Sequence, residues 1–258
     1  MNTTTPLVIV TGACGGIGAA VTQHLLTEGY AVLACDTQEQ ILSNTQHPTE
    51  KCEYYPLDVT DETCVQHLGD YLRQRHQPVQ GLINCAGIVH AAPLLETTLE
   101  QWRTVHAVNA DGVFLVTREV AQYMIEQQPQ DPTNSRGIVT ISSNAANVPR
   151  AEFGAYGASK AAATRVTTSF GLQLAPHGIR ANVLCPGTTR TPMVTDSWNG
   201  EDLSQTPIKG SLENYRLGIP LGRIAEPEDI AEVATFLLSP RAKHVTMQSL
   251  TVDGGATF

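Results

Sequence analysis

Short apolar runs alternate with longer helical patterns along the whole chain. Several of these runs are apolar nearly throughout, which is typical of strands that are covered on both faces. We expect strands at residues 7–10, 31–35, 53–57, 81–84, 138–142, 180–184 and 250–252. The longer patterns predict helices at residues 16–28, 61–76, 99–126, 155–176 and 227–238.

The alternation of strands and helices predicts an α/β fold. Because a strand, a helix and the next strand form a right-handed crossover, the strands should be parallel and helices should cover both faces of the sheet. We predict a single Rossmann-type domain over residues 1–258, a doubly wound parallel sheet of about seven strands. Gly29 is expected to end the first helix, and Thr97 or Thr98 to begin the third.

Two segments interrupt this alternation. Residues 127–136 are rich in Pro, Gln and Asp, and we expect a solvated surface loop there. Residues 188–218 contain several prolines and glycines and are too many for a simple connection. Because long irregular segments in compact domains often cover a ligand site, we predict a substrate lid at 188–218.

Charge and composition favour a small-molecule partner. The formal net charge is -9, and Lys and Arg are scattered, which argues against a surface for nucleic acid or for an anionic membrane. The first residues lack the basic region and length of a secretory signal, and no apolar run approaches membrane-spanning length, so we expect a cytoplasmic protein. The six cysteines show no CxxC spacing and the eight histidines are dispersed, so we expect reduced thiols and no metal site.

A glycine-rich turn follows the first predicted strand and leads into a helix. Its sequence is Thr11-Gly12-Ala13-Cys14-Gly15-Gly16-Ile17-Gly18. Such a turn lets the backbone approach a pyrophosphate, which the N–H groups of the helix N-terminus then bind. The spacing of Gly12, Gly16 and Gly18 differs from the general GxGxxG dinucleotide pattern, and the alternative is a tight turn without a ligand.

Asp36, at the end of the second predicted strand, indicates that the turn binds a dinucleotide and also which dinucleotide it binds. A carboxylate there accepts hydrogen bonds from the adenosine ribose hydroxyls and repels a 2′-phosphate. No Arg or Lys occurs between Asp36 and Lys51 to bind such a phosphate. The sequence therefore predicts NAD rather than NADP.

Tyr156 and Lys160 are spaced so that both side chains share one helix face. A nearby ammonium favours the phenolate, and lowering a phenol pKa from about 10 by three units requires about 4 kcal/mol. Lys160 together with an oxidised nicotinamide ring is a plausible source of that stabilisation. Ser143 lies thirteen residues earlier, at the carboxyl end of a predicted central strand, where its hydroxyl can bind a substrate oxygen. An isolated Tyr and Lys at this spacing more often lie on a solvated face.

Together these residues resemble the short-chain dehydrogenase/reductase family over essentially the whole chain. The order of motifs carries the resemblance, although Cys85 stands where the family usually has a second Asn. The resemblance implies that Tyr156 is the general acid/base, that Lys160 binds the nicotinamide ribose and lowers the phenol pKa, that Ser143 orients the reacting oxygen, and that Asn109 helps to hold a relay water. It implies cofactor contacts from Gly12, Gly16, Ile17, Gly18, Asp36, Asp58, Val59, Asn84, Gly87, Tyr156, Lys160, Pro186, Gly187 and Thr191.

A closer resemblance within the family, in residues 143–150 and 186–193, is to dehydrogenases that oxidise a carboxylated cyclic diol to a catechol in siderophore synthesis. An acidic protein needs a local cation for that carboxylate. Arg150 is the first candidate because its planar guanidinium matches a carboxylate, with Arg190 second. A surface pair of Arg150 with Glu152 is the alternative. Met193 is expected to cover the ring from the lid.

Two other functions remain compatible with these motifs. One is a family member that acts on another alcohol or ketone, such as a sugar, a steroid or an acyl carrier substrate. The other is a non-catalytic NAD-binding scaffold, which the intact Ser143, Tyr156 and Lys160 disfavour. The resemblance also implies a homotetramer.

Overall fold

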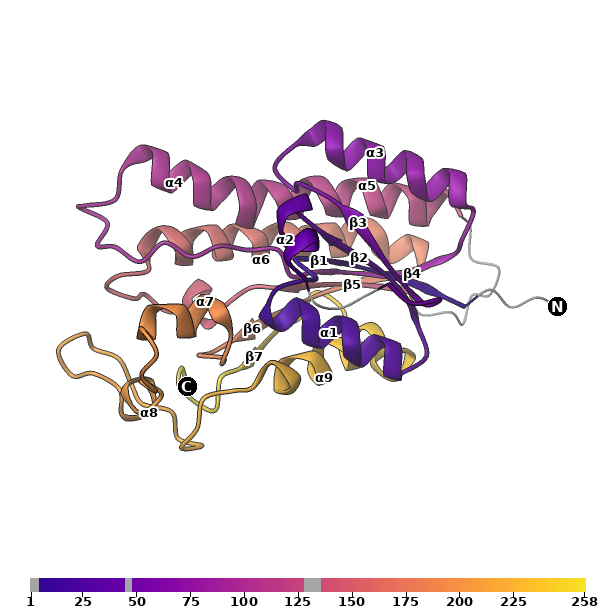
Figure 1. The fold of residues 1–258 in the computed structure, drawn as a ribbon. Coiled ribbons are helices and arrows are strands. Elements are labelled where there is room, and N and C mark those ends of the chain that lie inside the picture. The colour runs from indigo at the N-terminus through magenta and orange to yellow at the C-terminus, as the bar shows by residue number, and fades with distance from the viewer. Residues whose placement is uncertain (1–4, 45–47, 128–135) are drawn as a thin grey trace.

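A parallel sheet forms the centre of the protein in this computed structural model, which describes residues 5–44, 48–127 and 136–258 (Figure 1). Within those residues the sheet has seven strands in the order β3-β2-β1-β4-β5-β6-β7, and every neighbouring pair is parallel. The predicted Rossmann-type doubly wound sheet is confirmed. The strands are β1 (Leu7–Thr11), β2 (Ala31–Asp36), β3 (Cys52–Pro56), β4 (Val79–Asn84), β5 (Arg136–Ile141), β6 (Ile179–Pro186) and β7 (Ser249–Val252).

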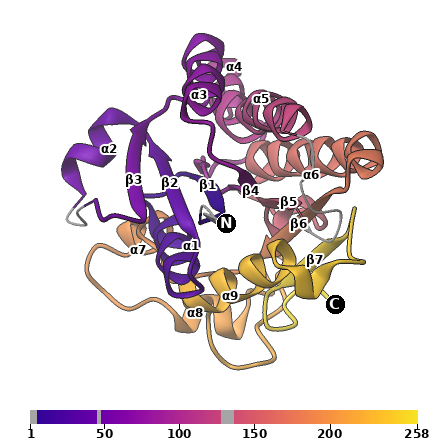
Figure 2. The same ribbon diagram turned by 90° about the vertical axis from the view of Figure 1, so that its right-hand side faces the viewer.

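Helices cover both faces of this sheet (Figure 2). The helices α3 (Glu62–Arg75), α5 (Gly112–Glu126) and α6 (Gly154–Leu174) lie on one face, and α1 (Gly16–Thr27) and α9 (Pro227–Leu238) lie on the other. Adjacent residues of a strand point to opposite faces. Ile9 of β1 therefore packs in the apolar cluster beneath α3 and α5, while Val8 packs in the cluster against α1 and α9.

The order in which the chain adds strands to the sheet reverses at β1 and β4. From β1 the sheet extends first through β2 to β3, and then on the other side through β4 to β7. The loops that follow β1 and β4 therefore separate and leave a crevice at the carboxyl edge of the sheet. Thr11 ties the two loops together at their base, because its Oγ1 accepts hydrogen bonds from the backbone N–H groups of Cys85 and Ala86, both at 3.2 Å.

The predicted helix at 99–126 is divided in the structure. It consists of α4 (Leu99–His106), a π-helical turn (Ala107–Asp111) and α5. The spacing of apolar residues cannot reveal such a turn. One added residue shifts that spacing no more than the irregularities of an ordinary helix do. Thr98 begins α4 with a capping box, and Gly29 has the positive φ of 91° expected just beyond the last turn of α1. The short helix α2 (Gln38–Ser43) was not predicted.

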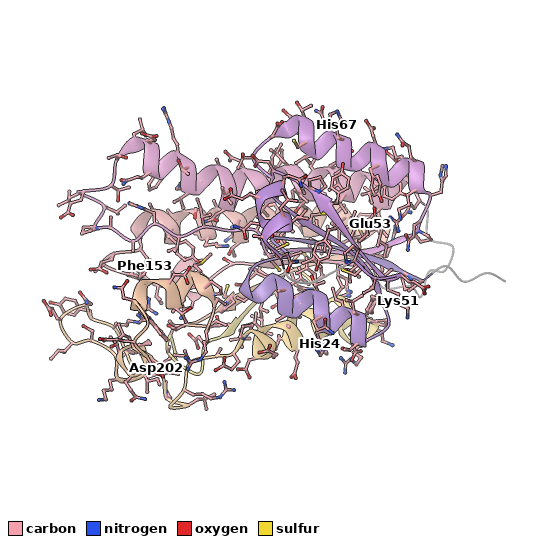
Figure 3. The ribbon with its side chains drawn as sticks, viewed as in Figure 1. His24, Lys51, Glu53, His67, Phe153 and Asp202 are labelled. Atoms are coloured by element: carbon pink, nitrogen blue, oxygen red, sulfur yellow. The ribbon has the colours of Figure 1, made fainter. Side chains whose placement is uncertain are left out.

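The predicted lid segment contains two short helices, α7 (Pro192–Thr195) and α8 (Gln205–Lys209), which sequence patterns did not indicate. It lies beside the carboxyl ends of the strands (Figure 1). Figure 3 shows Asp202 of this segment and Phe153 toward the same end of the sheet, with Lys51 toward the opposite end. Trp198 and Ile208 anchor the segment by packing against a small apolar cluster of Ile219, Ile224 and Ala256.

Most of the surface loop predicted at 127–136 falls on residues 128–135, which lie outside the described residues. Arg136, at its end, instead begins β5 and is buried, and its Nη2 donates to the carbonyl oxygen of His177 at 2.8 Å. Among the described residues, no helix is both long and apolar enough to span a membrane.

The central strands should carry much of the stability. Leu82 of β4 is 0% exposed, and we expect Leu82→Ala to reduce the free energy of unfolding by about 2–5 kcal/mol because it leaves a cavity between packed layers. Leu42 is 77% exposed, so Leu42→Ala is the matched control and should change stability by less than about 0.5 kcal/mol. Urea denaturation of both variants measures the difference, and equal losses would contradict this description of the core.

Candidate active site

A cleft of about 530 Å³ opens at the carboxyl ends of the strands. Residues from the turn after β1, the ends of β2, β4, β5 and β6, helix α6 and the lid segment line it. The predicted site residues among them are Gly12, Gly16, Ile17, Gly18, Asp36, Asp58, Val59, Gly87, Ser143, Tyr156, Lys160, Pro186, Gly187, Thr191 and Met193. Thus residues spread over most of the sequence surround one cleft.

The turn after β1 has room for backbone only. Gly12 has a φ of 64°, and a Cβ there would lie 2.7 Å from the backbone nitrogen of Ala86. A Cβ on Gly18 would lie 2.0 Å from the carbonyl oxygen of Gly12. No side chain caps the N-terminus of α1, so its first N–H groups face the cleft with a partial positive charge. This arrangement suits an anion such as a pyrophosphate.

Asp36 lies at the edge of the cleft that the adenosine half of a dinucleotide would occupy. Its Oδ2 accepts a hydrogen bond from the backbone N–H of Cys14 at 2.8 Å, and its Oδ1 accepts one from Thr37 at 2.9 Å. These bonds fix the carboxylate against the glycine-rich turn. Each carboxylate oxygen keeps further acceptor capacity for a hydroxyl.

Ser143, Tyr156 and Lys160 form a cluster at the other end of the cleft. The Ser143 hydroxyl acts on the phenol of Tyr156 as a hydrogen-bonding neighbour and lowers its pKa. The Nζ of Lys160 lies 5.9 Å from the centre of the Tyr156 ring and donates to the carbonyl oxygen of Ile141 at 3.0 Å. The neighbouring Ser142 hydroxyl instead donates to the backbone carbonyl of Lys160 at 3.0 Å.

Two predicted site residues serve the scaffold in this structure. Asn109, in the π-helical turn, is fully buried and accepts from the N–H of Ile88 at 2.9 Å while donating to the Ile88 carbonyl at 2.9 Å. Asn84 is buried and its Nδ2 donates to Thr117 and Thr140 at 3.0 and 3.2 Å. Neither side chain lines the cleft. A relay role for Asn109 stays a prediction.

The two arginine candidates differ in their surroundings. Arg190 donates to Glu226 at 3.1 Å and lies near Asp202, so its charge is already paired outside the cleft. Arg150 is half-buried in the loop between Ser143 and α6. Like Arg190 it is not among the residues that line the cleft, but it forms no ion pair within the described part of the chain. The alternative pairing of Arg150 with Glu152 is therefore absent among those residues.

The comparison with known proteins agrees with this geometry. A family model described as enoyl-(acyl carrier protein) reductase matches residues 12–257. The 2,3-dihydro-2,3-dihydroxybenzoate dehydrogenase of Bacillus subtilis is 38% identical over 256 residues, which cover 98% of this chain and 96% of that protein. The vibriobactin-specific 2,3-dihydro-2,3-dihydroxybenzoate dehydrogenase of Vibrio cholerae is 40% identical over 97% of this chain and 95% of its own length.

The chain belongs to the short-chain dehydrogenase/reductase family. The ligand-free aldohexose dehydrogenase of Thermoplasma acidophilum has a similar structure, with a TM-score of 0.83 and 28% sequence identity over 98% of this chain and 94% of that one. Membership of this family makes the protein an oxidoreductase that uses a nicotinamide cofactor.

The electrostatics of this short-chain dehydrogenase differ from the sequence-based expectation in one respect. Burial is the largest influence on Tyr156 and raises its pKa, whereas the hydrogen bond from Ser143 lowers it. Burial also lowers the pKa of Lys160 to about 8. The protein alone therefore holds a protonated phenol at neutral pH, and the expected lowering requires a further positive charge in the cleft.

Sequence reasoning missed some of the residues that shape this cleft. Thr189 and Ile88 line it, and Cys14 orients Asp36 through its backbone N–H. Thr189 lies within the Pro186 to Met193 motif, which was the available signal. The contribution of Cys14 could not be predicted, because its backbone N–H makes the hydrogen bond and any residue type carries such a group.

The Ser143 hydrogen bond should be visible in the pH profile of this dehydrogenase. Because this interaction favours the phenolate, Ser143→Ala should raise the pKa of Tyr156 and move the rising limb of kcat/KM for alcohol oxidation to higher pH. Ser142→Ala, whose hydroxyl binds a backbone carbonyl, is the control and should leave the limb in place. A limb that stays or moves to lower pH in Ser143→Ala would refute the assignment.

Proposed function

We propose that the protein oxidises 2,3-dihydro-2,3-dihydroxybenzoate to 2,3-dihydroxybenzoate with NAD, a step in catechol siderophore synthesis. The observation that carries this proposal is the Ser143, Tyr156 and Lys160 cluster, which shares one cleft with the glycine-rich turn and Asp36. Identity of 38–40% over nearly the whole chain to dehydrogenases of that name supports the choice of substrate.

The reaction divides between the chain and its cofactor. When bound, NAD supplies the hydride acceptor for the C3 carbon of the diol. The Tyr156 phenolate accepts the proton of the C3 hydroxyl, and the Ser143 hydroxyl donates a hydrogen bond to the same oxygen. Lys160 stabilises the phenolate by its positive charge. The resulting ketone tautomerises to the aromatic catechol, which favours the oxidative direction.

The residues that would hold NAD fit its parts. The bare backbone of the Gly12 to Gly18 turn suits the pyrophosphate, and Asp36 suits the adenosine ribose. Thr191, at the start of α7, lies against Gly16, where a Cβ would be 2.5 Å from the threonine Cγ2, so the glycine-rich turn and the lid segment meet at the cleft. We assign the nicotinamide carboxamide to Thr191.

Arg150 is the residue that we assign to the substrate carboxylate. It lies in the loop that joins Ser143 to α6, and Phe153 of that loop packs its ring edge-on against Tyr156 at a centroid distance of 6.2 Å. To Met193, which is 46% exposed and lines the cleft, we assign the role of covering the substrate ring.

We also propose that copies of the chain associate into a homotetramer. Phe114 of α5 and Leu172 of α6 are 40% and 69% exposed, and Leu250 of the edge strand β7 is 41% exposed. Apolar side chains at these places suit interfaces along the helices and the C-terminal edge.

A second candidate is a dehydrogenase for a sugar, which the structural similarity to an aldohexose dehydrogenase favours. Turnover separates the two. We expect NADH to form from 2,3-dihydro-2,3-dihydroxybenzoate with a kcat/KM at least about 100-fold above that for aldohexoses. Tyr156→Phe should lower kcat by about 100-fold or more, because it removes the group that accepts the proton. Turnover of aldohexoses alone would end the proposal, and an unimpaired Tyr156→Phe would end the assigned chemistry.

Cofactor choice provides an independent test. We expect NAD to be preferred over NADP by about 100-fold in kcat/KM, since Asp36 repels a 2′-phosphate. Asp36→Ser should reduce the preference by about 10-fold or more by removing that charge. Glu39→Gln removes an exposed charge nearby on α2 and should leave the preference unchanged. Equal use of both cofactors by the unaltered protein would contradict the role of Asp36.

A further inference from the structure

Asp253 follows β7, and its carboxylate joins the C-terminal end of the chain to the active site. Its Oδ1 accepts a hydrogen bond from the N–H of Gly255 at 3.0 Å, and its Oδ2 accepts one from the Thr257 hydroxyl at 2.6 Å. The same Oδ2 accepts a third bond, at 3.2 Å, from the side-chain amide of Asn144. Asp253 and Asn144 are 109 residues apart in the sequence, and Asn144 is the residue directly after Ser143.

Asn144 begins a 3₁₀ turn, Asn144–Ala146, which orients the Ser143 hydroxyl. Ser143 precedes the turn, and its Oγ accepts a hydrogen bond from the N–H of Ala145 at 3.1 Å. The backbone carbonyl of Ser143 accepts a second bond from the N–H of Ala146 at 3.0 Å. Because one lone pair of Oγ is used in this way, the hydroxyl keeps its hydrogen and its other lone pair for the cleft. The position of the turn therefore determines the position of this hydroxyl.

The same turn packs against α6 beside Tyr156. A Cβ on Gly157, the residue after Tyr156, would lie only 2.7 Å from the carbonyl oxygen of Ala145. The turn therefore contacts the carboxylate of Asp253 through Asn144 and the helix that carries Tyr156 through Ala145. Asn144 is 8% exposed, so removal of the carboxylate would take away a hydrogen-bond partner that water cannot easily replace.

Asp253 is itself held in place by the neighbouring strand. The N–H of Gly187, directly after β6, donates to the carbonyl oxygen of Val252 at 3.0 Å. A Cβ on Gly187 would lie 2.6 Å from the Asp253 Cβ, so these two residues are in close contact. Gly187 and Ser143 both line the cleft. The carboxylate thus projects from a fixed point at the carboxyl edge of the sheet.

We propose that Asp253 is a positioning residue for the reaction, because its hydrogen bond to Asn144 holds the 3₁₀ turn that places the Ser143 hydroxyl at the reacting oxygen. This inference rests on the roles proposed for Ser143 and Tyr156, and Asp253 acts through Asn144 without touching the substrate. A carboxylate suits the position because all three of its partners donate, and an ionised acceptor strengthens such bonds. An amide there would offer one acceptor oxygen in place of two.

Two substitutions remove this hydrogen bond from its two ends. Asp253→Ala keeps the Cβ that packs on Gly187, and Asn144→Ala keeps the carboxylate. In steady-state kinetics with 2,3-dihydro-2,3-dihydroxybenzoate, we expect each to lower kcat by about 10-fold or more, because the Ser143 hydroxyl is no longer held in place. KM for NAD should change by less than about threefold. The rising limb of kcat/KM should move to higher pH, as in Ser143→Ala.

The double variant tests whether the two residues act as a unit. Asp253→Ala combined with Asn144→Ala should lower kcat no further than either change alone, within about twofold, because each already breaks the same contact. Thr257→Val is the control, since it removes a different bond to the same Oδ2 and should change kcat by less than about threefold. Unchanged kcat and pH limb in both single variants, or losses that multiply in the double variant, would overturn the positioning role while the proposed function stands.

Hydrogen exchange separates this inference from the proposed function. With NAD present, the backbone amides of residues 143–148 should exchange about 10-fold faster or more in Asp253→Ala and in Asn144→Ala, and at the unaltered rate in Thr257→Val. If Asp253→Ala does not fold, Asn144→Ala decides, because it breaks the same bond. If the unaltered protein does not oxidise the diol, the proposed function fails. The exchange then decides the inference by itself, since unchanged protection of residues 143–148 would overturn it and lost protection would support it.

Discussion

A buried ammonium is the constraint around which the catalytic end of the cleft is built. Lys160 is 4% exposed, and its Nζ donates to the carbonyl oxygen of Ile141 at the end of β5. Such burial disfavours the charged form, which is why its pKa falls to about 8. Gly87 leaves the space that the ammonium needs, since a Cβ there would lie 3.0 Å from Nζ. Asn109 then holds the next residue, Ile88, by both backbone groups. The end of β5, helix α6 and the loop after β4 therefore all meet at this ammonium.

Much of the fold could be predicted from the sequence because its signals are local and repeated. Runs such as Leu7 to Val10 are apolar on both faces, and only a strand covered on both sides accommodates them. The order of these runs and the crossover rule then determine a parallel sheet. The site followed from the same logic, because ligands gather at the carboxyl ends of parallel strands, where Asp36, Ser143 and Gly187 all occur.

The remaining features depend on contacts between distant residues. The side chain of Arg216 reaches Thr188 at the other end of the lid, a contact that their separation along the chain conceals. The pKa of Tyr156 is a similar case. Spacing places Lys160 on the same helix face, but the degree of burial, which has the opposite effect on the phenol, is a property of the packed cleft. Arg190 is the opposite case. The sequence indicated it as a substrate residue, but in the structure its charge is already paired with Glu226.

The π-helical turn at Ala107–Asp111 has a consequence for how this helix pair tolerates change in length. A π turn holds one residue more than an α-helical turn, and each residue of an α-helix rotates the chain by about 100°. Removing one residue there would restore regular helical hydrogen bonding, but it would also change which side chain faces Ile88. The side chain that replaces Asn109 would then leave Ile88 unsupported. The extra residue fixes the register of the helix at this point. This stretch should therefore tolerate a deletion less well than a uniform helix, which can shorten at its ends.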